Sequence, residues 1–363
     1  MPIDFTPERW NRVRERYGRW WEGELENPLV QVRVADRNPG RPQPAAPILS
    51  QANCHEFSIP AADLIDRMDY EYSKITYLGD DFPSLTLTTF GPGIMAALCG
   101  ADLDNSAGGC WFHPRKQLPI EEIHLAYEPE NPWLLRIKEI CRAAMDRWEG
   151  RVLVQMPDLG GNMDILASFL TTEQLLMALY DKPAEVKRLL WEEHELWFRY
   201  YGEIADIIRP GSPGYTDWAC IYSETPSYVL QCDFSYMIGP EMFVEFVRPE
   251  LAASCERLDH SMYHLDGKGQ LPHLDHLLSI RELDAIQWVP GAGNPSSGEW
   301  PELHRKVAKA GKRMQIHGTW TDLEKTIKAI GDIASPGAIH ARLAFRGNAA
   351  EAKTCLKDLG IEP

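Results

Sequence analysis

Several motifs that would assign a function at once are missing from this sequence. No GxGxxG follows the first predicted strand and no GxxxxGK[ST] occurs anywhere, so a dinucleotide or P-loop site is not indicated. No GxSxG marks a serine nucleophile. The eight cysteines are scattered without a CxxC pair, which favours reduced thiols over disulfides or a redox motif. Cys220 and Cys232 lie in no activating motif and are expected to be packing residues.

Basic residues and long apolar runs are also scarce. The chain has 37 Lys and Arg against 53 Asp and Glu, a net charge of -16, and binding nucleic-acid phosphates needs a basic surface. No apolar run approaches the ~18 residues that cross a bilayer. The N-terminus is amphipathic and charged, without the apolar core of a signal peptide. We therefore expect a cytoplasmic protein that binds neither nucleic acid nor membrane.

What the sequence does contain is a regular alternation of short β-rich runs with longer amphipathic runs. Such alternation is typical of parallel βαβ units, and eight of them predict an α/β fold built as a single (β/α)8 TIM barrel. An open doubly wound sheet is the alternative. We expect residues 1–27 to form an N-terminal helical extension packed on a barrel of residues 28–363. The predicted strands are 28–35, 85–90, 151–158, 214–222, 261–266, 284–291, 312–318 and 337–345.

Polar and aromatic side chains gather where these strands end, and in a TIM barrel the carboxyl ends of the strands carry the active site. We predict catalytic roles for five residues: Asp164, Asp233, His264, Asp266 and His317. We predict substrate contacts from six others: Asp158, Asp217, Trp218, Tyr222, Trp288 and Arg342.

His264 and Asp266 form the most specific local pattern, because residues two apart on a strand point to the same face. Together with His340 they would bind a divalent metal, and imidazole with carboxylate suits Zn2+, Mn2+ or Fe2+. The alternative is a hydrogen-bonding wall without a metal. In that case a carboxylate pair, Asp158 with Asp164 or Asp217 with Asp233, would divide the acid and base roles.

Four segments carry a resemblance to a known family: "GDDFPSLTLTTFGPG", "CDFSYMIGPEMFVEFVRPEL", "YHLDGKG" and "LDAIQWVPGAGNP". Over roughly residues 10–360 the chain resembles the uroporphyrinogen decarboxylase superfamily, which includes zinc-dependent, corrinoid-linked Co-methyltransferases. The resemblance implies a (β/α)8 barrel. In the methyltransferases a His-x-Cys and a last-strand Cys hold zinc. Here His264 matches the histidine, Asp266 replaces the first thiolate, and His340 is the nearest last-strand candidate.

The resemblance implies a methyltransferase-like enzyme acting on a small molecule, with a corrinoid carried on a partner protein. Because the superfamily often dimerises, it also favours a homodimer. True uroporphyrinogen decarboxylase fits less well, since its N-terminal arginine motif is not found here. Two alternatives stay open: a lyase (decarboxylase) or hydrolase acting on a sugar-like or aromatic molecule through Asp and His, and a barrel that binds a small molecule without catalysis.

Overall fold

The computed structural model describes residues 2–363 and shows an α/β fold, as the sequence predicts. Its main sheet has seven strands in the order β2-β1-β11-β10-β9-β8-β7. All neighbouring pairs are parallel except β1 with β2, which is antiparallel. The strands are β1 (Leu29–Ala35), β2 (Ile75–Gly79), β7 (Ser227–Leu230), β8 (His260–Asp266), β9 (Ala285–Val289), β10 (Arg313–Gly318) and β11 (Ile339–Leu343).

Two smaller sheets complete the β structure. β3 (Ser84–Leu85) pairs in parallel with β6 (Leu153–Val154), and β4 (Asp102–Asp104) forms an antiparallel hairpin with β5 (Trp111–His113). The β3–β6 sheet is not continuous with the main sheet. The strands of residues 2–363 are thus hydrogen-bonded in three separate sheets.

The strand predicted over 214–222 is wrong, and its replacement explains part of this interruption. Only an isolated bridge joins Tyr215 to Ser223, and Cys220 has a positive φ of 56°, which a regular strand does not allow. The carbonyls of Ala219 and Cys220 accept hydrogen bonds from the side chains of Gln315 and Gln31, at 2.8 and 2.9 Å. Inward-facing glutamines thus satisfy backbone groups that a strand would pair within a ladder.

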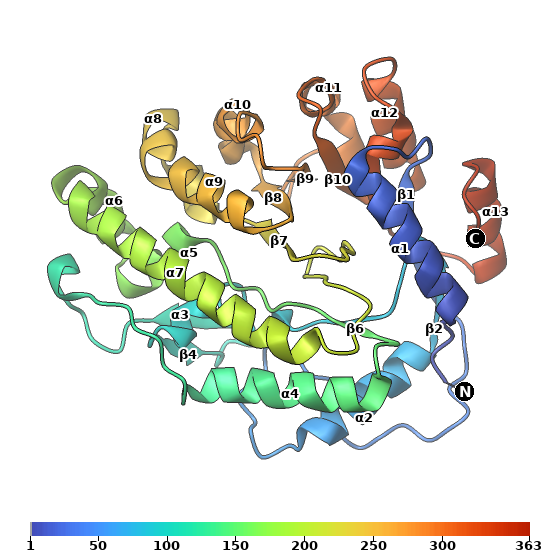
Figure 1. The fold of residues 1–363 in the computed structure, drawn as a ribbon, viewed down its shortest axis with the longest axis horizontal. Coiled ribbons are helices and arrows are strands. Elements are labelled where there is room, and N and C mark those ends of the chain that lie inside the picture. The colour runs from blue at the N-terminus through green and yellow to red at the C-terminus, as the bar shows by residue number, and fades with distance from the viewer. Residues whose placement is uncertain (1) are drawn as a thin grey trace.

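Helices lie around the strands, with α4 and α7 side by side on one flank (Figure 1). No helix within residues 2–363 combines the length and apolar character that crossing a bilayer requires. Pro183 begins α7 directly after α6, at a position where proline is favoured because the first turn of a helix needs no amide donor. The α-helices are α1 (Pro7–Glu22), α2 (Ala61–Ser73), α3 (Met95–Leu98), α4 (Pro132–Trp148), α5 (Asn162–Phe169), α6 (Thr172–Asp181), α7 (Pro183–Ile208), α8 (Pro240–Met242), α9 (Arg248–Arg257), α10 (Leu274–Leu278), α11 (Pro301–Lys309), α12 (Trp320–Ile330) and α13 (Ala349–Asp358).

Short 3-10 and π segments interrupt the chain at several points. A π-helical stretch, η4 (Phe243–Val247), joins α8 to α9. The 3-10 segments are η1 (Thr88–Phe90), η2 (Ile120–Glu122), η3 (Asp233–Met237), η5 (Lys268–His273), η6 (Ser297–Glu299) and η7 (Pro336–Ala338).

The N-terminal helix α1 packs against the amino ends of the strands. Its buried aromatic face shares a core with Leu29, Leu153 and Ala285, which lie at the amino ends of β1, β6 and β9. Tyr17 and Trp10 of this face also meet Tyr222 at ring distances of 5.9 and 6.2 Å. This face therefore covers the end of the sheet opposite the predicted active site.

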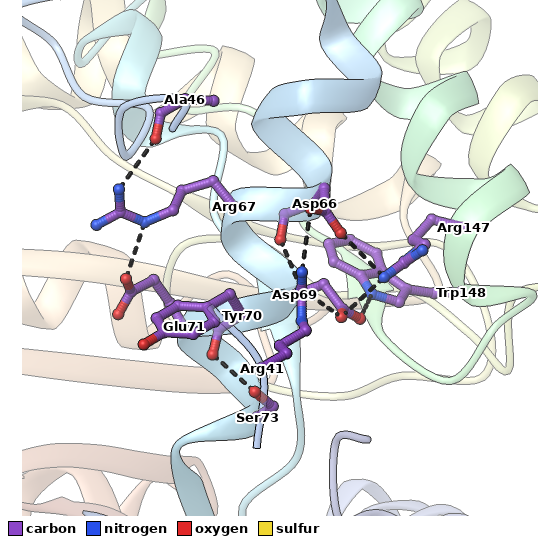
Figure 2. Close-up of polar contacts among 10 residues, drawn as sticks. All are labelled: Arg41, Ala46, Asp66, Arg67, Asp69, Tyr70, Glu71, Ser73, Arg147 and Trp148. Atoms are coloured by element: carbon purple, nitrogen blue, oxygen red, sulfur yellow. Dashed lines mark hydrogen bonds and ion pairs between the residues drawn. The ribbon is translucent and has the colours of Figure 1, made fainter. Parts of the chain in front are cut away.

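The proline-rich segment 36–50 is fastened to the surface of α2. Arg41 contacts both Asp66 and Asp69 at 3.1 Å, and Arg67 donates a 2.9 Å hydrogen bond to the carbonyl of Ala46 (Figure 2). Arg147 of α4 shares the same two aspartates. Arg41 and Arg147 thus both have carboxylate partners.

Glu193 of α7 is fully buried, and neither oxygen of its side chain has a hydrogen-bond partner in the described chain. Burial, followed by the charges of Glu250 and Asp164, raises the pKa of Glu193 well above its usual value. Because the folded-state pKa lies above the unfolded one, the neutral form favours folding at acid pH. That contribution is lost as the pH rises through the folded pKa.

We therefore expect Glu193→Met to raise the free energy of unfolding by about 1–3 kcal/mol at pH 8, and by less at pH 4. Denaturant unfolding at both pH values measures the difference. Glu195→Met, an exposed position on the same helix, is the control and should change stability by less than about 0.5 kcal/mol. An equal change in the free energy of unfolding at both pH values, or a loss of stability at pH 8, would contradict the prediction.

Candidate metal centre

Two carboxylate side chains and one imidazole side chain converge beyond the carboxyl ends of β7 and β8. Asp233 begins η3 just after β7, and His264 and Asp266 close β8. One donor atom from each of the three lies within 4.8 Å of the other two. The His264 Nε2 to Asp266 Oδ2 distance is 3.9 Å. These three residues have the donor types and spacing of a divalent metal site.

Glycines allow the segments around this cluster to approach closely. Gly267 has a φ of +78°, a left-handed conformation that turns the chain directly after Asp266. A side chain at Gly161 would place its Cβ 2.1 Å from the carbonyl oxygen of Gln231. Only glycine therefore lets the start of α5 lie against the segment that follows β7, and this contact brings Asp164 beside Asp233.

The Asp164 carboxylate is oriented by main-chain amides. Oδ2 accepts a hydrogen bond from Asp233 N at 2.9 Å, and Oδ1 accepts one from Phe234 N at 2.6 Å. Burial, and then the charge of Asp233, nevertheless raises the pKa of Asp164 to about 7. A carboxyl group held in place with a pKa near neutrality is suited to proton transfer.

A row of hydrogen-bonded side chains crosses four neighbouring strands and ends at His264. The parallel register places His264 beside Gln287, Gln287 beside Gln315, and Gln315 beside His340. His264 Nδ1 contacts Gln287 Oε1, Gln287 Nε2 donates to Gln315 Oε1, and Gln315 Nε2 meets His340 Nδ1 at 2.9 Å. His340 Nε2 lies 3.0 Å from the hydroxyl of Tyr17 in α1. We call this row the glutamine ladder.

A backbone carbonyl fixes the direction of the ladder. The Ala219 carbonyl can only accept, so the Gln315 group 2.8 Å away is the amide nitrogen. Gln315 then presents its oxygen to Gln287, and Gln287 in turn presents its own oxygen to His264. His264 Nδ1 must therefore carry a proton, which makes Nε2, on the Asp266 side, the ring nitrogen that is placed to bind a metal. A hydrogen bond of this kind at the other ring nitrogen orients a metal-binding histidine.

His340 lies outside the metal cluster, although the sequence suggested it as a ligand. It is fully buried, and both of its ring nitrogens are engaged, one by Gln315 and one by Tyr17. Burial lowers the pKa of His340 well below its usual value, so the ring is neutral. Asp233 takes the third position in the cluster instead.

A cleft of about 850 Å³ adjoins the cluster. Asp164, Asp233 and Phe234 form one wall, and Trp111 and Phe112 of the β4–β5 hairpin form another. Trp111 is 65% exposed, which is unusual for a tryptophan without a ligand or partner. The cleft therefore offers an apolar, aromatic surface directly beside the proposed metal ligands.

Three of the residues predicted to contact substrate are aromatic, and of these only Trp218 lies beside the cluster. Trp218 contacts His264 edge to face, with ring centroids 4.9 Å apart. Tyr222 lies in the α1 core, and Trp288 alternates with Gln287 and packs on Trp300 at 5.1 Å. Neither Tyr222 nor Trp288 lines the cleft. Aromatic content alone does not separate packing residues from binding residues.

Asp158 and Asp217 are buried carboxylates that hold the backbone. Asp158 accepts a hydrogen bond from Gly160 N at 3.1 Å, and Asp217 accepts from Ala219 N and Val229 N at 2.9 and 2.7 Å. Burial raises the pKa of each to about 7. Their oxygens are directed at the main chain, so we assign them a structural part in shaping the site.

His317 and Arg342 lie apart from the cluster, next to each other at the ends of β10 and β11. They line a second pocket of about 310 Å³ together with Gln31 and Arg33. Desolvation, and then the positive charge of Arg342, lowers the pKa of His317, although its ring still reaches solvent.

Cys220 and Cys232 are placed as packing residues, as the sequence predicts. All eight cysteines are free thiols, and both Cys220 and Cys232 are buried. Burial raises the pKa of Cys232 well above its usual value, which disfavours the reactive thiolate.

Sequence reasoning missed the glutamine ladder, although a signal for it exists. "IQW" at 286–288 and "MQI" at 314–316 each place one glutamine inside an apolar strand. A buried polar residue without a partner is costly, so the same residue at the same position of two neighbouring strands indicates mutual pairing.

Removing Gln287 tests whether the ladder supports His264. We expect Gln287→Leu to lower Mn2+ affinity about 10–100-fold, because the Nδ1 proton loses its acceptor. Calorimetric titration measures the affinity, and 15N NMR of the His264 ring reports its tautomer. The control is Gln155→Leu, a buried glutamine that bonds Ser84 and lies off the ladder. Wild-type affinity in Gln287→Leu would show that the ladder has no part in metal binding.

The chain was also compared with known proteins. No family model matches it, and no curated protein matches it. The resemblance to the uroporphyrinogen decarboxylase superfamily therefore stays a prediction that rests on the quoted segments.

Proposed function

We propose that the protein is a metal-dependent enzyme that acts on a small molecule in the 850 Å³ cleft. The observation that carries this proposal is the convergence of Asp233, His264 and Asp266 at the edge of that cleft. Two alternatives to a metal site explain the cluster less well. A structural ion pair would need only two of the three residues, and a solvated acidic patch would need no hydrogen bond that orients the histidine ring.

The donor set favours a hard or borderline metal. Two carboxylates and one imidazole suit Mn2+, Fe2+ or Zn2+, whereas thiolates select softer or more thiophilic ions. Asp266 stands where the related methyltransferases have a thiolate. When bound, the metal would act as a Lewis acid that polarises an oxygen atom of the substrate.

Within this site the reaction class we favour is lyase chemistry, such as decarboxylation. Asp164 lies on the cleft wall with both oxygens anchored by main-chain amides, so it can hold or release a proton at a fixed position. Trp111 and Phe112 line the cleft and supply flat apolar surfaces for an aromatic or sugar-like substrate. His264 Nε2 faces Asp266 rather than Asp164. The metal-binding and proton-transfer roles therefore lie on separate residues.

A second candidate is methyl transfer with a corrinoid on a partner protein. It is favoured by the rim of the cleft, where Trp111, Tyr236 and Met237 expose 65%, 57% and 47% of their surface. Exposed apolar side chains grouped beside an active site are typical of a docking surface for another protein. The carboxylate at Asp266 argues against zinc-thiolate activation in this protein.

We further propose that the seven-stranded sheet and the β3–β6 sheet form parts of the wall of one barrel. Met156 N, just after β6, donates a 2.9 Å hydrogen bond to the Thr216 carbonyl of the irregular segment that precedes β7. On the other side, Asp80 N donates to the Val30 carbonyl in β1 at 2.8 Å. These contacts support a barrel wall that continues around the site, with irregular segments between the regular strands.

Metal titration of the purified protein, made without a histidine tag, tests the proposal. We expect about one Mn2+ per chain, with affinity reduced at least about 10-fold in His264→Ala and in Asp266→Ala. The control is Asp275→Ala, an exposed aspartate on α10. Asp266→Cys should shift the preference toward Zn2+, since a thiolate is a softer ligand. Binding of less than about 0.2 equivalents by the wild type would contradict the metal centre.

Incubation with methylcobalamin and a thiol separates the two reaction classes. We expect no loss of the cobalt–methyl absorbance, because no thiolate ligand is present to help activate the acceptor. Metal-dependent demethylation that is lost in His264→Ala would instead support the second candidate.

A further inference from the structure

The second pocket, at the ends of β1, β10 and β11, has the features of a separate binding site. The strand register aligns Gln31 with Arg342 and Arg342 with His317, so the three side chains form a row at one level of the sheet. They line a space of about 310 Å³ with Arg33. Aligned residues on neighbouring strands present their side chains on the same face.

The two arginines of this pocket differ in their partners. Arg33 donates two hydrogen bonds to Asp81, Nε to Oδ2 at 3.0 Å and Nη2 to Oδ1 at 2.8 Å, and the Asp81 side chain has no exposed surface. This paired geometry satisfies the carboxylate. Arg342, by contrast, makes no salt bridge or side-chain hydrogen bond anywhere in residues 2–363. The pocket therefore contains one arginine without a direct carboxylate partner, in a chain of net charge -16.

Gln31 provides a second polar group without a partner, in this case a hydrogen-bond acceptor. It is 4% exposed, and its Nε2 donates to the Tyr17 hydroxyl and the Cys220 carbonyl at 2.8 and 2.9 Å. Its Oε1 is buried and accepts no hydrogen bond within the described chain. A buried acceptor without a donor is costly, so a ligand that supplies the donor would be recognised.

A comparison within the molecule shows that this combination is not general. The pocket beside α2 and α4 also contains Arg41 and Arg147, but both share Asp66 and Asp69 (Figure 2). Arg41 and Arg147 thus have direct carboxylate partners, whereas Arg342 has none.

We propose that the second pocket binds a small 2-hydroxycarboxylate. The carboxylate would take the planar fork of Arg342, with His317 beside it, and the hydroxyl on the adjacent carbon would donate to Gln31 Oε1. Arg is the side chain best matched to a carboxylate because its donors form a rigid pair. This pocket shares no lining residue with the 850 Å³ cleft, so the inference goes beyond the proposed function and does not depend on it.

Ligand-observed NMR titration of the full chain, freed of metal with a chelator, tests the proposal with glycolate, acetate and inorganic phosphate as probes. We expect glycolate to bind with a Kd of about 1 mM, as suits a ligand of five heavy atoms. Acetate, which lacks the hydroxyl, should bind about five-fold more weakly. Equal binding of acetate and glycolate, or tighter binding of phosphate, would overturn the assignment to a 2-hydroxycarboxylate.

Variants locate the site. Arg342→Met should weaken glycolate binding by at least about 10-fold. The matched control is Arg346→Met, which removes the same charge from an exposed position four residues on and should leave the Kd unchanged. Gln31→Met should abolish the preference for glycolate over acetate. Wild-type glycolate affinity in Arg342→Met would place the binding elsewhere and overturn the proposal.

A parallel Mn2+ titration distinguishes this inference from the proposed function. Arg342→Met should retain wild-type Mn2+ affinity, and His264→Ala should retain wild-type glycolate affinity. If the wild type binds Mn2+ but not glycolate, the pocket assignment fails alone. If it binds glycolate but not Mn2+, the metal centre fails alone.

Discussion

The hydrogen bond between Gln315 and the carbonyl of Ala219 is the constraint on which the site depends. It fixes the direction of every bond in the glutamine ladder, and through Gln287 it determines which nitrogen of His264 carries the proton. The same contact holds the irregular segment 216–222 inside the sheet, where a strand was expected. One interaction thus links the departure from a regular barrel to the chemistry at the strand ends.

Burial acts on the charged groups of this molecule in two different ways. Asp164 and Asp158 are anchored by main-chain amides and have pKa values raised to about 7. Glu193 has no anchoring hydrogen bond in the described chain, and the neutral form is favoured there. Around Arg342 the situation is reversed, because a cation rather than an acid lacks its partner.

Local patterns in the sequence were enough to predict the α/β class and the side-by-side placement of His264 with Asp266. Strand alternation is a local property, and it holds for β8 regardless of the rest of the fold. The closure of the sheet is not local. It depends on segment 214–222, whose apolar and aromatic residues are typical of a strand but whose backbone turns at Cys220. Likewise, Tyr222 and Trp288 have the composition of a binding site and pack in cores, since burial depends on what the rest of the chain places against them.

Crystals soaked with Mn2+ and measured for anomalous scattering test the metal centre most directly. The geometry predicts one strong anomalous peak at bonding distance from His264 Nε2 and from carboxylate oxygens of Asp233 and Asp266. The glutamine ladder should remain intact at Nδ1. A peak on the Nδ1 side of His264, or no peak at a saturating Mn2+ concentration, would contradict both the ligand set and the tautomer assigned to His264.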